Sequence, residues 1–210
     1  MNKCLVCDSV IENVLTNLFE DCNNVCYECI SKLKQRNERF TVNGCDGMVL
    51  YFYDDFFKNI LFRYKGCGDY FLNEIFLINH YSWIKRKYKG YSIVLAPSNK
   101  EAEEKRGFCH LEGIFKRLNM PVIKCFRKDI EWKQSNKYKS EREQIQNVIK
   151  IDKSELLGVK HVLIVDDVLT SGSTIKTMIS QIPPNILKKV LVLSSNCRIL
   201  KNEIVWIEFI

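Results

Sequence analysis

Short apolar runs alternate with segments of helical periodicity along the second half of the chain. Residues 93–96 and 162–165 are compact apolar runs of the kind that form buried strands. After the second run, apolar side chains recur at helical spacing over residues 175–182, and Pro183 and Pro184 prevent the helix from continuing. Strands that alternate with helices predict an α/β fold, in which helices flank a parallel sheet.

Two further units precede the second run. Residues 48–53 predict a strand and residues 56–64 a helix that ends at Gly66, together forming a small cap region near the active edge of the sheet. A strand over 93–96, a helix over 101–118 and a strand over 122–126 then make a βαβ unit. The polar segment 127–152 that follows predicts a lid.

A hydroxyl-rich loop joins the strand at 162–165 to the last helix. Asp166 and Asp167 follow the apolar run, and the segment Thr170 to Thr174 opens the helix. Unpaired N–H groups at a helix N-terminus bind phosphate, and Gly172 lets the backbone approach a ligand closely. Adjacent carboxylates favour hydroxyl groups or a magnesium-linked ligand instead. The loop lacks the Walker and dinucleotide-binding patterns; the alternative to a phosphate site is an ordinary helix cap with a solvated loop.

The composition is that of an ordinary globular protein. The chain has 210 residues, of which 46% are hydrophobic, enough to build a core. The sequence has no run of eighteen apolar residues and no apolar core of a signal peptide near its start. We therefore expect a cytoplasmic protein without membrane insertion.

Four of the ten cysteines have the spacing of a metal site. They form two Cys-x-x-Cys pairs, which are Cys4 with Cys7 and Cys26 with Cys29. Such pairs complete a tetrahedral, structural zinc site with no open position for catalysis. We expect a four-cysteine zinc-binding module over residues 1–40, with Cys22 as a spectator; four unliganded thiols are the alternative.

The chain has a net charge of +7, and its basic residues are unevenly distributed along the sequence. One basic and aromatic stretch contains Lys85, Arg86, Lys87, Tyr88 and Lys89. Basic side chains neutralise phosphates and aromatic faces stack on bases, so single-stranded DNA is a predicted partner. A solvated lysine-rich surface explains the same composition equally well.

The segment "VLIVDDVLTSGST" resembles the loop that binds phosphoribosyl pyrophosphate (PRPP) in type I phosphoribosyltransferases. The resemblance assigns Asp166 and Asp167 to the ribose hydroxyls and to magnesium bound with PRPP. It assigns the 5′-phosphate to Thr170, Ser171, Gly172, Ser173 and Thr174. Enzymes of this family that act on 6-oxopurines carry an acid where Thr170 stands, which argues against purine salvage.

The order of motifs is similar to that of the ComF-type competence proteins over essentially the whole chain. The segments are "FRYKGCGD", "APSNKEAEEKRGFCH", "KQSNKYKSEREQIQN" and "VDDVLTSGST". The resemblance assigns pyrophosphate binding to Pro97, Ser98, Asn99, Lys100 and Arg106. Two positions depart from the family pattern: Cys109-His110 replaces Asn-Gln, and Ala96 replaces a proline. Because no partner acid is indicated nearby in sequence, His110 is expected to be a surface or packing residue, and no general base is assigned.

The resemblance implies a PRPP-binding protein of the natural competence machinery, which acts in DNA uptake and transformation on the cytosolic side. Its fold would be a type I phosphoribosyltransferase-like domain over residues 41–210, with the cap region at 41–90 and the PRPP-binding core at 91–210. Two alternatives stay open. One is an active phosphoribosyltransferase of nucleotide metabolism with an unknown base acceptor. The other is a non-catalytic zinc-ribbon adaptor for a DNA-uptake helicase. The resemblance also implies a homodimer.

Overall fold

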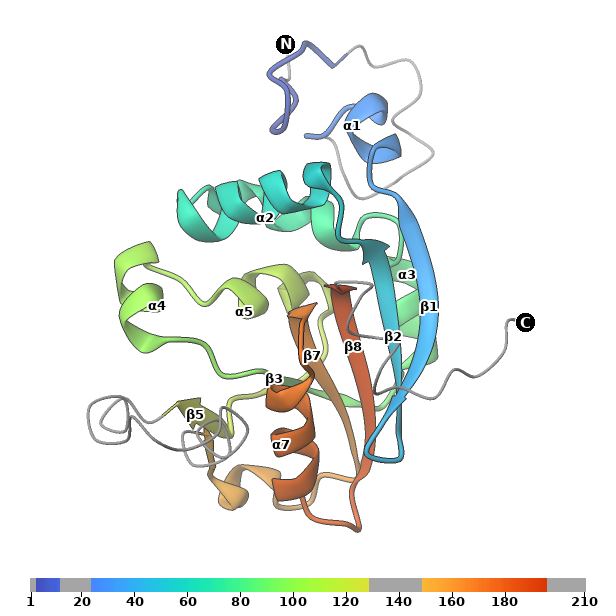
Figure 1. Ribbon diagram of the computed structural model, residues 1–210, viewed down its shortest axis with the longest axis vertical. Coiled ribbons are helices and arrows are strands. Elements are labelled where there is room, and N and C mark those ends of the chain that lie inside the picture. The colour runs from blue at the N-terminus through green and yellow to red at the C-terminus, as the bar shows by residue number, and fades with distance from the viewer. Residues whose placement is uncertain (1–2, 12–23, 129–148, 196–210) are drawn as a thin grey trace.

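The computed structural model describes residues 3–11, 24–128 and 149–195, and a six-stranded sheet lies at its centre (Figure 1). The strand order is β1-β2-β8-β7-β3-β4, and every neighbouring pair is parallel except the first. The strands are β1 (Gln35–Val42), β2 (Cys45–Phe52), β3 (Ser92–Leu95), β4 (Val122–Ile123), β7 (His161–Leu169) and β8 (Leu187–Ser195). A separate antiparallel pair contains β5 (Phe126–Lys128) and β6 (Ile149–Ile151).

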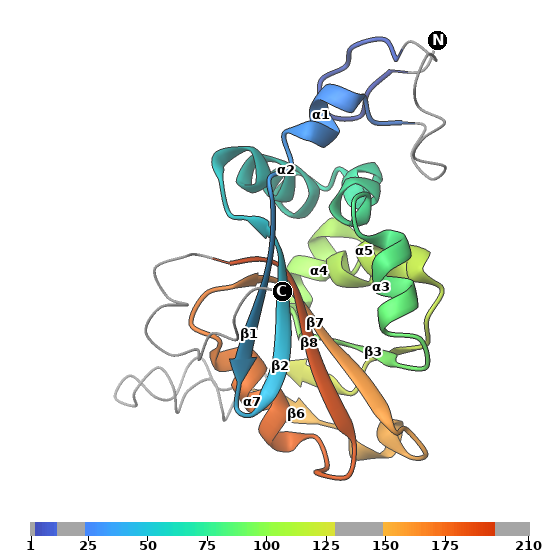
Figure 2. The ribbon, with the colours of Figure 1, turned by 90° about the vertical axis from the view of Figure 1, so that its right-hand side faces the viewer.

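Helices cover both faces of this sheet, with α3 and α5 on one side and α7 on the other (Figure 2). The α-helices are α1 (Tyr27–Ser31), α2 (Asp55–Gly66), α3 (Tyr81–Lys87), α4 (Lys100–Arg106), α5 (His110–Phe115) and α7 (Ser173–Gln181). The 3-10 helices are η2 (Tyr70–Leu77), η3 (Lys116–Leu118) and η5 (Lys153–Leu156). In the described part of the chain, no helix combines the length and apolar character needed to cross a membrane. The mostly parallel, helix-flanked sheet confirms the predicted fold class.

The central strand β7 is longer than its apolar run predicts. Its residues 162–165 are fully buried, as expected for a strand covered on both faces. The strand then continues through both acids, because Asp166 pairs with Val192 and Leu169 pairs with Ser195 of β8. The acids therefore lie within the last part of the strand rather than after it.

The single helix predicted over residues 101–118 is wrong, because the chain breaks it after Arg106. Gly107 adopts a left-handed backbone with φ of 81°, which ends α4, and α5 begins three residues later. The strand predicted over 122–126 is also divided. Residues 122–123 join the main sheet as β4, whereas Phe126 begins β5 in the smaller sheet.

The N-terminal part of the chain contributes an edge of the main sheet. β1 and β2 form an antiparallel pair, and β2 lies parallel to β8. Since β1 begins at Gln35, the module boundary predicted at residue 40 falls inside a strand. The predicted strand at 48–53 is likewise part of the sheet, which leaves α2, η2 and α3 to form the cap.

Candidate functional site

A pocket of about 350 Å³ lies beside the last part of β7, where the loops after the strands converge. Its walls come from α2, the loop between β3 and α4, both short helices that follow, β5, β7 and α7. The lining residues are Lys65, Ala96, Pro97, Ser98, Asn99, Ala102, Arg106, His110, Lys128, Asp166, Asp167, Val168 and Thr174. This is the edge of a parallel sheet at which α/β proteins bind ligands.

The Asp167 carboxylate is held by several hydrogen-bond partners in the pocket. Its side chain is buried, and its Oδ2 lies 3.1 Å from Nε2 of His110 and accepts a hydrogen bond from Nζ of Lys65. Its Oδ1 accepts a hydrogen bond from the backbone N–H of Val168 at 2.7 Å. Burial alone would raise the pKa of Asp167, but the His110 hydrogen bond and the Lys65 charge outweigh burial and lower it. Asp167 is therefore ionised.

Asp166 has the opposite electrostatic character. Burial and then the negative charge of Asp167 raise the pKa of Asp166 well above the ordinary carboxyl value. Its Oδ1 accepts one hydrogen bond, from the backbone N–H of Asp167 at 2.9 Å. A cation or a hydroxyl donor that entered the pocket would compensate for the missing partners of its charged form.

His110 lies in this pocket rather than at the surface. It is 4% exposed, and its backbone carbonyl accepts a hydrogen bond from the Tyr64 hydroxyl at 2.7 Å. Burial lowers the pKa of His110, against the opposing effect of Asp167. The sequence indicates no partner acid close to His110, and the structure supplies a distant one, because Asp167 lies 57 residues away in sequence and in contact in space. Lys65 was also missed, and the "FRYKGCGD" motif that contains it was the available signal.

Arg106 has donors ready for an anion. Its Nε and Nη2 atoms are buried, and no hydrogen-bond partner for them is found among the described residues. Lys128 lines the same pocket from β5. An unpaired buried donor is costly, so an anionic ligand would be stabilised here.

Three of the other residues predicted to bind pyrophosphate also line the pocket, namely Pro97, Ser98 and Asn99. Ser98 donates a hydrogen bond to the Glu103 carboxylate, and Asn99 caps α4 by accepting from the backbone N–H of Glu101. The structure does not bring Lys100 into the pocket. Its side chain is 76% exposed and its Nζ lies 3.8 Å from Glu104.

Of the five predicted phosphate-loop residues, Thr174 lines the pocket and the others extend beyond it. Gly172 has φ of 70° and precedes α7, so its left-handed backbone turns the loop into the helix. The Ser171 and Ser173 hydroxyl oxygens lie 2.6 Å apart. The loop therefore presents hydroxyl groups and a helix N-terminus next to the two acids.

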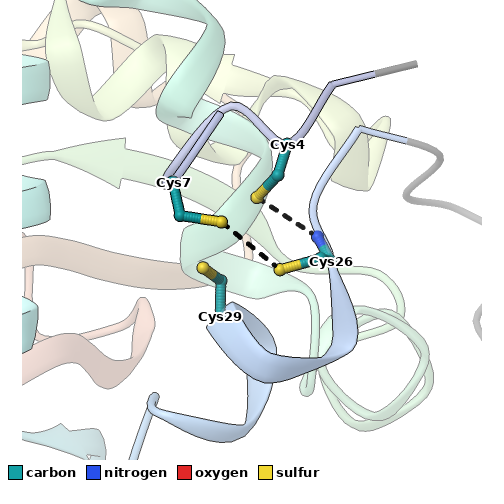
Figure 3. Close-up of side chains that lie close together, drawn as sticks. All are labelled: Cys4, Cys7, Cys26 and Cys29. Carbon is teal, nitrogen blue, oxygen red and sulfur yellow. Dashed lines mark hydrogen bonds between the residues drawn. The ribbon is translucent and has the colours of Figure 1, made fainter. Parts of the chain in front are cut away.

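The two cysteine pairs meet in space, and their four sulfur atoms lie within 4.8 Å of one another (Figure 3). The Cys7 and Cys26 sulfurs are 3.7 Å apart, close to the separation of about 3.8 Å in a tetrahedron with zinc–sulfur bonds of about 2.3 Å. Backbone N–H groups of Val6 and Cys26 donate to the Cys4 sulfur. The cluster can hold a metal ion such as zinc. Cys22 lies outside the described residues.

Arg63 of α2 forms hydrogen bonds to the backbone of the four-cysteine module. Its guanidinium donates hydrogen bonds to the carbonyl oxygens of Val6 at 2.7 Å and Leu5 at 2.9 Å, and pairs with Asp69 at 3.0 Å. The module therefore contacts the same helix that supplies Lys65 to the pocket.

The basic and aromatic stretch forms α3 and the turn after it. Lys85, Arg86, Lys87 and Lys89 are exposed, whereas Tyr88 is 4% exposed and cannot offer its ring face to a base on the surface. The predicted lid at 127–152 lies mostly outside the described residues, except for its ends in β5 and β6.

Known proteins share the sequence pattern of this chain. Residues 104–190 match the family described as "Phosphoribosyl transferase domain". The competence protein ComFC of Streptococcus pneumoniae is 27% identical, with 82% of this chain and 90% of that protein covered. ComFC of Bacillus subtilis is also 27% identical, with coverage of 82% and 85%.

The comparison with solved structures found phosphoribosyltransferases of low sequence identity. Adenine phosphoribosyltransferase of Saccharomyces cerevisiae is 14% identical, with 82% of this chain and 90% of that chain covered and a TM-score of 0.42. Orotate phosphoribosyltransferase of Aeropyrum pernix is 12% identical, with coverage of 83% and 93% and a TM-score of 0.37.

Proposed function

We propose that this chain, which is similar to ComFC and contains a phosphoribosyl transferase domain, binds PRPP together with magnesium in the pocket around Asp167. The observation that carries the proposal is the meeting of two adjacent acids, a hydroxyl-rich helix N-terminus and the unpaired donors of Arg106 at one sheet edge. PRPP contains a diol, a 5′-phosphate and a pyrophosphate, and each group has a chemical counterpart there.

The acids would bind the ribose unequally. Asp167 already accepts three hydrogen bonds, which leave it little capacity for a ribose hydroxyl. Asp166 accepts one, so its free oxygen is the better acceptor. We therefore assign the main ribose contact to Asp166 and a positioning role to Asp167, which Lys65 and His110 hold in place.

The donor set suits magnesium, which prefers carboxylate and phosphate oxygens and keeps several waters. Asp166 would hold the ion together with PRPP, with the negative charge of Asp167 beside it, and the ion would supply positive charge at the departing pyrophosphate. Arg106, with Lys128 beside it, would neutralise the same pyrophosphate through its unpaired N–H groups. Thr174 and the N-terminus of α7 would hold the 5′-phosphate.

Calorimetric titration with PRPP and magnesium tests this proposal. Wild-type protein is expected to bind, and the double substitution Asp166→Asn with Asp167→Asn should abolish binding. Asp55→Asn is the matched control, because Asp55 is an exposed acid of α2 outside the pocket. Absence of binding by folded wild-type protein, or equal binding by the double variant, would overturn the proposal.

The relatives' name supports a role in competence, and we propose that this protein serves DNA uptake on the cytosolic side. The protein could serve this role as a transferase, a sensor or an adaptor, and one assay result distinguishes each. Pyrophosphate release with an added base would identify a transferase. PRPP binding that alters affinity for single-stranded DNA, without release, would identify a sensor. Helicase binding insensitive to Asp166→Asn would identify an adaptor that docks through the zinc module.

A further inference from the structure

A second cavity of about 350 Å³ opens where the β1–β2 hairpin, β8 and the end of α3 meet. Its lining residues are Arg39, Phe40, Asp46, Gly47, Lys87, Tyr88, Tyr91 and Lys189. It shares no lining residue with the pocket around Asp167, so it is a separate candidate site.

Positive charge exceeds negative charge in this cavity. Three cationic side chains line it, against the single carboxylate of Asp46, which accepts a hydrogen bond from Lys189. Arg39 and Lys87 thus add two positive charges that no lining acid balances. Burial, and then the charges of Arg39 and Lys189, lower the pKa of Lys87, against the opposing charge of Asp46. An anion between the cations would offset these positive charges.

Aromatic rings also line the cavity. The half-buried Tyr91 ring meets Tyr88 edge-to-face, with centroids 5.6 Å apart. The Lys87 ammonium lies 4.5 Å from the centroid of the Trp83 ring and 5.6 Å from that of Tyr88. Phe40 packs directly over Gly47, where an added Cβ would lie 2.3 Å from the ring. The cavity thus combines cationic side chains with aromatic rings.

We propose that this cavity binds one nucleotide, with Arg39 and Lys87 on its phosphate and the Tyr91 ring against its base. Cations that neutralise phosphate and aromatic rings that stack on bases are the two elements of sequence-tolerant nucleotide binding. The volume lies near the lower end of small-molecule sites, which suits a single nucleotide rather than a continuous strand. The nucleotide is either a free nucleoside 5′-monophosphate or the 5′-phosphorylated end of a DNA strand, because both present the same groups.

Trp83 provides a local signal for the test, since a phosphate that draws the Lys87 ammonium away changes the environment of the Trp83 ring. The experiment uses the full chain with Trp132→Phe and Trp206→Phe, so that emission comes from Trp83 alone. Deoxyadenosine 5′-monophosphate is titrated, with inorganic phosphate and deoxyadenosine as half-ligands. The titration is repeated with Asp166→Asn plus Asp167→Asn, which removes binding at the other pocket. A 5′-phosphorylated and an unphosphorylated (dA)₄ compare the two sources.

We expect saturable binding of the monophosphate, at least tenfold tighter than that of either half-ligand and unaffected by the two Asp→Asn changes. Lys87→Gln and Arg39→Gln should each weaken it at least tenfold. Lys58→Gln is the matched control, because Lys58 is an exposed lysine of α2 that pairs with Asp55 and lines neither cavity. Tighter binding of phosphorylated than of unphosphorylated (dA)₄ would identify the strand end as the source, and equal binding of the two would identify the free nucleotide. No saturable binding, equal losses in Lys58→Gln and Lys87→Gln, or loss in the Asp→Asn background would overturn the proposal.

Discussion

Acidification should destabilise this protein through His80, at the start of α3. His80 is 5% exposed, and burial lowers its pKa from 6.5 to about 4. Its Nε2 lies 2.6 Å from Oδ1 of Asn37 and its Nδ1 lies 3.0 Å from the Tyr51 hydroxyl. In the neutral ring, Nε2–H donates to Asn37 and Nδ1 accepts from Tyr51, so a second proton would remove that acceptor.

The sign and size follow from linkage. Below pH 6.5 the unfolded chain binds a proton at His80 that the folded chain does not bind until about pH 4, so stability is lost as pH falls through this interval. The expected loss is about 2 kcal/mol at pH 5 and approaches about 3 kcal/mol near pH 4, at 1.36 kcal/mol per pH unit. His110 contributes loss of the same sign, because burial also lowers its pKa.

Urea denaturation at pH 7 and pH 5 measures this effect, with the difference between wild type and His80→Gln isolating His80. The variant should be less stable than wild type at pH 7, because the packing of the His80 ring is lost. Between pH 7 and pH 5, however, the free energy of unfolding of the variant should fall by about 2 kcal/mol less than that of wild type. His161→Gln is the matched control and should keep the wild-type difference, since it leaves His80 in place. An unchanged pH dependence in His80→Gln would refute the reasoning.

Two further predictions concern the pocket and the metal module. Lys65→Met should weaken PRPP binding about tenfold or more, because a charge-assisted hydrogen bond contributes about 1.5–3 kcal/mol. The control Lys58→Met, on the same helix but outside the pocket, should leave PRPP binding unchanged. Equal losses of affinity in the two variants, measured by calorimetry, would contradict the role of Lys65. Removal of the metal by a chelator, or Cys29→Ser, should unfold the four-cysteine module, because a structural zinc ion contributes about 10 kcal/mol or more to folding. Arg63 would then lose its hydrogen bonds to the backbone carbonyl groups of the module. Hydrogen exchange should then rise at residues 24–34, whereas Cys67→Ser, an exposed thiol outside the cluster, should leave it unchanged; equal exchange in both variants would refute a structural metal.

Local signals made the strand, loop and helix around Gly172 predictable. The apolar run, the glycine and the two prolines all lie within about twenty residues, and the paired cysteines are equally local. The break after Arg106 was not predictable with the same rules. A lone Gly107 is tolerated within a helical pattern, and only the packing of α5 decides that it adopts a left-handed backbone instead.

The ion pairs of Asp167 mark the limit of sequence reasoning for the site. Lys65 lies 102 residues from Asp167 along the chain, and no periodicity relates the two. His110 is ambiguous for the same reason, since its acid partner becomes visible only when α5 packs beside β7. The type of chemistry was thus readable from local motifs, whereas the residues that tune it depend on tertiary contacts.

The pairing of β2 with β8 also has a consequence for biosynthesis. Gly47 lies opposite Val190, so the β1–β2 hairpin finds its neighbour only after the chain has left the ribosome beyond Val190. Closing so long a segment costs entropy before the pairing returns any stabilisation, and non-local parallel pairing is slow. During synthesis the hairpin therefore presents an unpaired strand edge, and a chain truncated before β8 would keep that edge exposed to aggregation.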